Sequence, residues 1–136
     1  MRARLLPLIL LLASGKLPAT DFPIEVIEFI DNARVVAFLD ATDIDTSSHW
    51  QPFAGPPPLS MTDALTAIHG HIADDPELAD ATLSGIELKR IPHHENYWHY
   101  LVRLQTRPGI KPHARYFIVL MSGKVLPGLR EPEPVK

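Results

Sequence analysis

The segments YWHYLVRLQ, residues 97–105, and ARYFIVLM, residues 114–121, decide the fold, and a turn at Ser122–Gly123 and a short return over 124–126 follow them. The even positions of the first segment are apolar and the odd positions are mixed, which is typical of a strand with two different faces. The second segment is apolar on both faces and predicts a strand covered on both sides. Gly123 can supply the positive φ that a two-residue hairpin turn needs.

The N-terminal half predicts another hairpin and one helix. Residues 24–30 and 33–39 are rich in β-forming residues and flank Asp31–Asn32, which tolerate the left-handed conformation of tight turns. A short amphipathic helix over 22–31 is the alternative for the first of these segments. Ser60 is a suitable N-cap for a helix. The apolar residues that recur with helical spacing after it are Met61, Ala64, Leu65, Ile68 and Ile72.

These elements predict an α+β fold in which an antiparallel sheet packs on one main helix. The sheet would combine the N-terminal hairpin with three to four C-terminal strands, one of them over residues 86–91, whereas residues 40–55 are expected to form a polar loop. The chain has 136 residues, which fits one domain. We place that domain at residues 20–129, followed by a Pro-rich tail over 130–136.

Residues 1–15 have the features of a secretory signal peptide. Arg2 and Arg4 precede the apolar segment Leu5–Ala13, and small residues at 13–15, or Ala19 further on, offer a cleavage site. The apolar segment is far shorter than the ~20 residues of a membrane-spanning helix. We therefore expect a periplasmic or secreted protein with no transmembrane span in the mature chain. A buried core helix or an uncleaved anchor is the alternative interpretation.

Composition excludes several classes of function. The formal net charge is −3 and the basic residues are scattered, so we expect no nucleic-acid partner. The chain has no cysteine, which excludes disulfides, thiol catalysis and thiolate metal sites. Acid–base catalysis needs two carboxylates, or a histidine with a carboxylate, in one cleft. No sequence pattern brings such a pair together, so we expect neither an enzyme nor a bound cofactor.

Histidine is frequent, with seven residues, but its spacing does not indicate a metal site. The adjacent residues His93 and His94 point apart in an extended chain. His69 and His71 lie roughly 200° apart on a helix, so they differ from helical zinc ligands, which are spaced i, i+4. We therefore expect no metal site. Convergence of His93 or His94 with His99 across a loop remains the alternative.

The less apolar face of the strand over 97–105 is the candidate binding surface. Tyr97, His99 and Arg103 share that face, and Arg115 of the next strand is expected beside them. Such a mixture suits recognition of a protein or peptide. The helix is expected on the opposite face, which would bury Trp98 and leave Tyr97 and His99 outside or at an edge. Alternatively, the helix covers one face and the N-terminal hairpin the other.

The order of helix, strand and hairpin resembles that of PepSY-like domains of exported bacterial proteins. The matching segments are MTDALTAI at 61–68, GIEL at 85–88, residues 97–105, and residues 116–125 with Gly123. The chain differs in having a single such unit and an additional N-terminal hairpin. The resemblance implies a non-enzymatic, extracytoplasmic binding or inhibitory module, and it supplies no catalytic residues.

The function expected from the sequence is an exported, non-enzymatic module that binds or regulates another macromolecule. Its partner would be a protein or peptide in the cell envelope. The alternative is a carrier of a small ligand or metal, which would use the crevice between helix and sheet together with His93, His94 and His99.

Overall fold

The computed structural model describes residues 23–106 and 113–132, so the predicted signal peptide lies outside the described residues. Within these ranges the chain forms six strands and two helices. In chain order they are β1 (Ile24–Ile30), β2 (Ala33–Leu39), α1 (Ala41–Thr46), α2 (Met61–Ile72), β3 (Thr82–Arg90), β4 (Trp98–Gln105), β5 (Ala114–Leu120) and β6 (Val125–Arg130).

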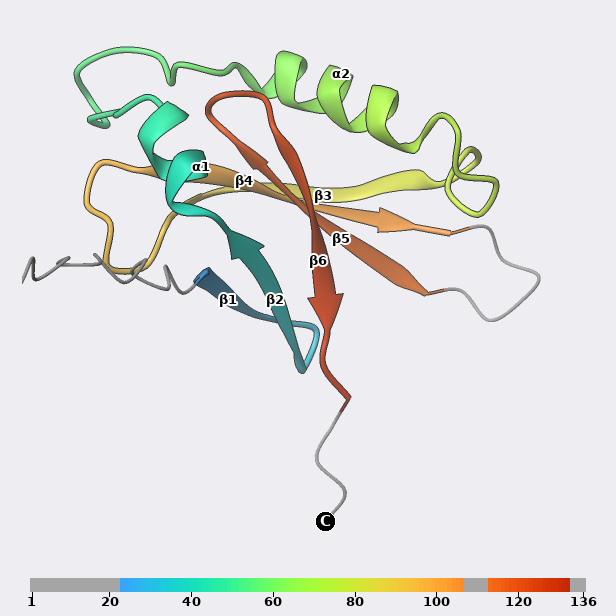
Figure 1. Ribbon diagram of the computed structural model, residues 1–136. Coiled ribbons are helices and arrows are strands. Elements are labelled where there is room, and N and C mark those ends of the chain that lie inside the picture. Colours follow the sequence, from blue (N-terminus) through green and yellow to red (C-terminus); the bar gives the residue numbers. More distant parts are fainter. Residues whose placement is uncertain (1–22, 107–112, 133–136) are drawn as a thin grey trace, which may run out of the picture.

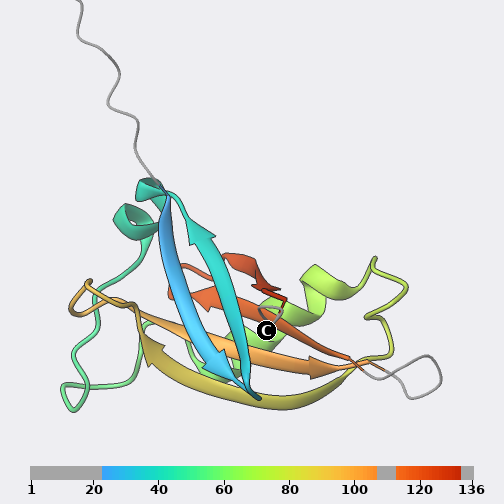
Figure 2. The same cartoon turned by 90° about the horizontal axis from the view of Figure 1, so that it is seen from below.

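The strands form one antiparallel sheet in the order β1-β2-β6-β5-β4-β3. The sheet curves into a half-barrel, with α2 on its outer side (Figure 1). Seen from below, the β1–β2 hairpin crosses β4 and β5 on the face opposite to the one that α2 covers (Figure 2). The strands β4 and β5 therefore lie between α2 and the hairpin, and below we call the face toward the hairpin the inner face.

The predicted fold, a sheet packed on one main helix, is wrong. The protein is mostly sheet and carries only two short helices in its described part. The physical reason is that β5 is apolar on both faces and β4 adds Leu101 to the second face, whereas one helix covers only one of these faces. The hairpin encloses a second core on the inner face. That core consists of Val26, Ala37, Leu39, Ile44, Ile91, Leu101, Ile118 and Leu120.

The helix α2 forms where the sequence predicts it. The Oγ atom of Ser60 accepts a hydrogen bond of 3.0 Å from the backbone N–H of Asp63, which satisfies one of the free donors at the start of the helix. Ala64, Ile68 and Ile72 form its buried stripe. They pack on the outer face of β4 and β5, where the core includes Tyr100, Val102, Leu104, Phe117 and Val119.

The hairpin of β1 and β2 has the predicted bounds. Asp31 and Asn32 at its turn have φ of 50° and 60°, which confirms the left-handed turn. The alternative of a helix over 22–31 is therefore wrong for the described residues. Gly123 in the β5–β6 turn has φ of 88°, as expected from the Ser122–Gly123 pair.

Three elements differ from the sequence-based expectation. The strand predicted over 86–91 begins earlier, at Thr82, and ends at Arg90. The helix α1 lies within the segment predicted as a loop, and β6 runs on to Arg130 through Pro127. Proline fits there because β2 pairs with β6 only at Leu129 and Arg130. The missing N–H of Pro127 therefore removes no hydrogen bond between these two strands.

Candidate functional site

The structure separates one of the four residues that the sequence predicts to share one binding surface. Tyr97, His99 and Arg103 share one face as predicted, the inner face, whereas Arg115 lies on the outer face. Tyr97 lies half-buried just before β4. The centre of its ring lies 4.3 Å from that of His49 and 6.3 Å from that of His94, so it belongs to an aromatic group at one end of the sheet.

The prediction that His99 lies outside or at an edge is wrong. Its side chain is 0% exposed, because the hairpin covers the inner face of β4. Trp98, predicted to lie in the core, is only half-buried, and its indole packs edge-on against Trp50 at 5.2 Å. The alternative in which the helix covers one face and the hairpin the other is therefore confirmed.

Arg103 and Arg115 lie on opposite faces of the sheet. Arg103 is on the inner face and forms an ion pair of 2.9 Å with Asp31. Arg115 lies opposite Leu104 in the register of β4 and β5, which places it on the outer face. There it forms an ion pair of 3.3 Å with Glu77. The register of these two strands thus prevents the four predicted residues from forming one surface.

A buried polar cluster connects β1, β3 and β4. The carboxylate of Glu28 accepts a hydrogen bond from the Lys89 ammonium and lies 3.5 Å from Nε2 of His99. Burial acts to raise the pKa of Glu28, but His99 and Lys89 outweigh it and hold the pKa below its ordinary value. Because the three residues come from three strands, the cluster fastens the hairpin to the rest of the half-barrel.

The histidines considered for metal binding do not form a site. His93 is exposed, His94 is half-buried and His99 lies in the interior. Among the residues with described positions, no group of three His, Asp or Glu side chains could hold a metal ion. The crevice between α2 and the sheet is filled by core side chains, including Ala64, Ile68 and Tyr100.

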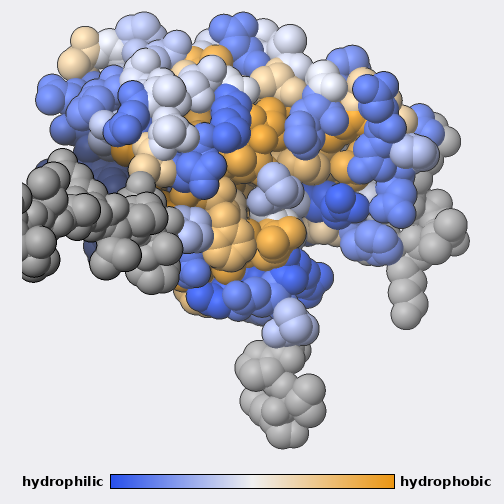
Figure 3. Space-filling model, viewed as in Figure 1, coloured by the Kyte–Doolittle hydropathy of each residue, from blue (hydrophilic) through white to orange (hydrophobic). Residues whose placement is uncertain are grey.

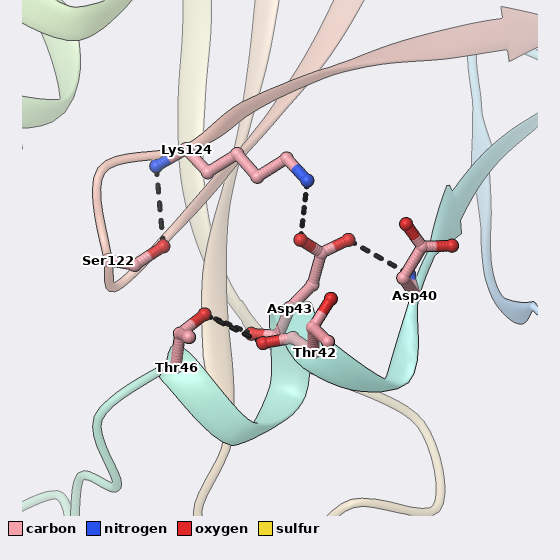
Figure 4. A network of polar contacts seen from close by, with 6 residues as sticks. All are labelled: Asp40, Thr42, Asp43, Thr46, Ser122 and Lys124. Atoms are coloured by element: carbon pink, nitrogen blue, oxygen red, sulfur yellow. Dashed lines mark hydrogen bonds and ion pairs between the residues drawn. The ribbon is translucent and has the colours of Figure 1, made fainter.

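The helix α1 is fastened to the β5–β6 turn by a second buried carboxylate (Figure 4). Oδ1 of Asp43 lies 2.5 Å from Nζ of Lys124, and Oδ2 accepts a hydrogen bond of 2.8 Å from the backbone N–H of Asp40. Burial raises the pKa of Asp43, but Lys124 and the Asp40 amide together lower it below its ordinary value. The charged groups of Asp43 and Lys124 therefore have a structural role, which is to hold α1 against the β5–β6 turn.

The outer face of the hairpin, with the adjoining β6, carries three of the exposed large apolar side chains in the described residues. We define the hairpin face as Ile27, Phe29, Val36, Phe38 and Leu129, of which Val36 is buried and Ile27 is half-buried between the larger side chains. Phe29 is 76% exposed, Phe38 45% and Leu129 52%. Figure 3 shows hydrophobic residues gathered from below α2 to the region of β2 and β6.

The strand register makes the hairpin face continuous. Ile27 lies opposite Val36 in β1 and β2, and Val36 lies opposite Leu129 in β6. Directly opposite side chains have Cβ atoms roughly 5 Å apart, and the diagonal neighbours of a large side chain are also within reach. Phe29 and Phe38 occupy such diagonal positions. The Arg34–Glu131 ion pair and Glu25 lie beside these residues and provide a polar rim.

Sequence reasoning missed the hairpin face, although the sequence contains a signal for it. Both alternating sets of the hairpin are largely apolar, since Val26 and Ala37 lie on one face and Ile27 and Phe38 on the other. A hairpin at the edge of a sheet packs one of its faces on the core. Its other face then stays exposed to solvent unless another element covers it.

The chain matches no known protein-family model, and neither a curated protein nor a solved structure is significantly similar to it. Neither helix in the described ranges is long and apolar enough to cross a membrane.

Proposed function

We propose that the protein is an exported, non-enzymatic module that binds another protein in the cell envelope through the hairpin face. One observation carries this proposal: two phenylalanines and a leucine, each exposed by 45% or more, lie on one continuous sheet surface. Exposed apolar patches of this kind mark interaction sites, and large aromatic side chains supply much of the binding energy of protein interfaces.

The composition of the hairpin face suits a protein partner. Its centre is apolar and its rim carries charged residues of both signs, which is the arrangement of many protein–protein interfaces. The charged groups of the interior are engaged in holding elements together, as Glu28 holds Lys89 and Asp43 holds Lys124. We therefore propose binding without catalysis.

Export is proposed from the sequence of residues 1–15. The mature chain would begin at Lys16 or Thr20. Loss of Arg2 and Arg4 would change its formal charge from −3 to −5 for a start at Lys16, and loss of Lys16 as well would make it −6 for a start at Thr20. The intact mass of the protein isolated from its host tests this part of the proposal. A mass that includes Met1 would contradict it.

Capture of partners from an envelope extract tests the binding function. The immobilised protein is compared with a Phe29→Ser/Phe38→Ser variant and with Leu83→Ser. Leu83 is a matched control because it is 48% exposed on β3, at the other edge of the sheet. We expect a stoichiometric partner that the double variant loses and Leu83→Ser retains. Equal capture by all three proteins, or sedimentation showing only self-association through this face, would contradict the proposal.

A further inference from the structure

A second surface lies at the end of the half-barrel, away from the hairpin face. There the loop after α1 meets the turn between β3 and β4. The backbone N–H of Trp50 donates a hydrogen bond of 2.9 Å to the carbonyl oxygen of Asn96, and the Trp50 indole N–H donates one of 3.1 Å to the carbonyl oxygen of Gly55. These bonds fasten the loop to the turn and shape a cleft of about 350 Å³. It is lined by Pro52, Phe53, Arg90, Glu95, Asn96 and Trp98.

The backbone of Phe53 at this cleft is strained. Phe53, His93 and Asn96 have φ of 72°, 63° and 66°, in the left-handed region, which asparagine and histidine tolerate but a bulky phenylalanine rarely adopts. For a bulky residue such as phenylalanine this conformation costs on the order of 1–3 kcal/mol. The Phe53 side chain is fully exposed, so burial does not offset that cost. Strained residues of this kind concentrate at binding sites, and the exposed ring of Phe53 is free to contact a ligand.

The polar groups of the cleft limit the chemistry of its ligand. Arg90 and Glu95 are exposed, and neither forms an ion pair with any residue whose position is described. Arg90 offers only donors, Glu95 only acceptors, and the Asn96 amide offers both. Because the two charges have opposite sign, the cleft favours no strongly charged ligand. A purely apolar ligand would leave these three groups without partners.

We propose that this cleft binds a neutral saccharide unit of a glycan. The C–H face of a sugar ring would lie against the aromatic rings of Phe53 and Trp98, since aromatic side chains combine a large apolar surface with a defined orientation. The hydroxyl groups of the sugar would both donate to and accept from the side chains of Glu95, Asn96 and Arg90. A volume of about 350 Å³ is near the lower end for ligand pockets and suits one or two sugar rings.

Tryptophan fluorescence provides a direct assay. The chain has two tryptophans, Trp50 and Trp98, and both lie at this site. The full chain is titrated with the neutral trisaccharides chitotriose, cellotriose and maltotriose, and with decaproline as a peptide probe. We expect a saturable fluorescence change with at least one trisaccharide and none with decaproline.

Two variants make the assay specific. Phe53→Ala removes a fully exposed ring, and Asn96→Gly removes the amide while suiting the left-handed backbone, so both should fold like the wild type. We expect each to weaken sugar binding at least tenfold, whereas Leu83→Ala, at the opposite end of β3 from Arg90, leaves it unchanged. The proposal is overturned if no trisaccharide binds at millimolar concentration, if decaproline binds instead, or if Phe53→Ala binds as well as the wild type.

Discussion

Glu28 offers the sharpest test of how the half-barrel is held together. Its side chain is 10% exposed and is the common neighbour of Lys89, which is 27% exposed, and of His99, which is fully buried. Removing one partner of a buried ion pair costs roughly 3–5 kcal/mol. Because Lys89 can turn partly toward water, we expect Glu28→Ala to lower the free energy of unfolding by about 3 kcal/mol, at the lower end of the range.

Urea unfolding followed by far-UV circular dichroism measures this loss. A loss of 3 kcal/mol corresponds to a decrease in Tm of about 10 °C for a domain of this size. The matched control is Glu131→Ala, which removes a more exposed ion pair with Arg34. Surface ion pairs are worth about 0–1 kcal/mol. If both variants lost less than about 1 kcal/mol, the Glu28 cluster would not be what holds the hairpin in place.

The same cluster should make stability depend on pH. The pKa of Glu28 is lowered in the folded protein, so the folded state holds this proton less tightly than the unfolded state. The stabilisation is therefore fully present above the ordinary carboxyl pKa of about 4.3. It is lost as the pH falls through the lower, folded-state value. Glu28→Gln should flatten the acid limb of a plot of unfolding free energy against pH, and an unchanged slope would refute this linkage.

Two further variants test the packing and the second carboxylate. Gly128→Ala should lower the unfolding free energy by about 1–3 kcal/mol, because the new Cβ would lie 2.8 Å from Cγ1 of Val35. Gly85→Ala has nothing within 4 Å and should be nearly neutral by the same urea assay. Lys124→Ala should raise the pKa of Asp43 and move acid unfolding to higher pH, which an NMR titration of the Asp43 carboxyl checks.

Local signals in the sequence were sufficient to predict the elements that short-range interactions specify. The β1–β2 hairpin followed from Asp31–Asn32 between two β-rich segments, and α2 followed from Ser60 and its helical stripe. In each case the deciding interactions lie within a few residues along the chain. The helix α1 was missed although its start carries a local signal, the capping pair Asp40 and Asp43, because the helix is only six residues long and has no apolar stripe of its own to mark it.

Local signals in the sequence could not predict which element covers each face of the sheet. Alternation along β4 shows that His99 and Leu101 share a face, but it does not show that the hairpin covers that face. Glu28 then becomes the partner of His99 only through the curvature of the sheet. Arg115 illustrates the same limit, because the register that places it opposite Leu104 depends on pairing across a loop.

The affinity of the purified partner for the protein with and without the Phe29 ring tests the central proposal most directly. Phe29 is 76% exposed, so Phe29→Ala should fold normally, and Leu83→Ala serves as the control with an exposed side chain on another strand. A central aromatic residue of an interface contributes about 2 kcal/mol or more, which corresponds to a roughly 30-fold increase in Kd. We predict such an increase by isothermal titration calorimetry for Phe29→Ala and none for Leu83→Ala. Wild-type affinity in Phe29→Ala would contradict the assignment of the hairpin face as the binding surface.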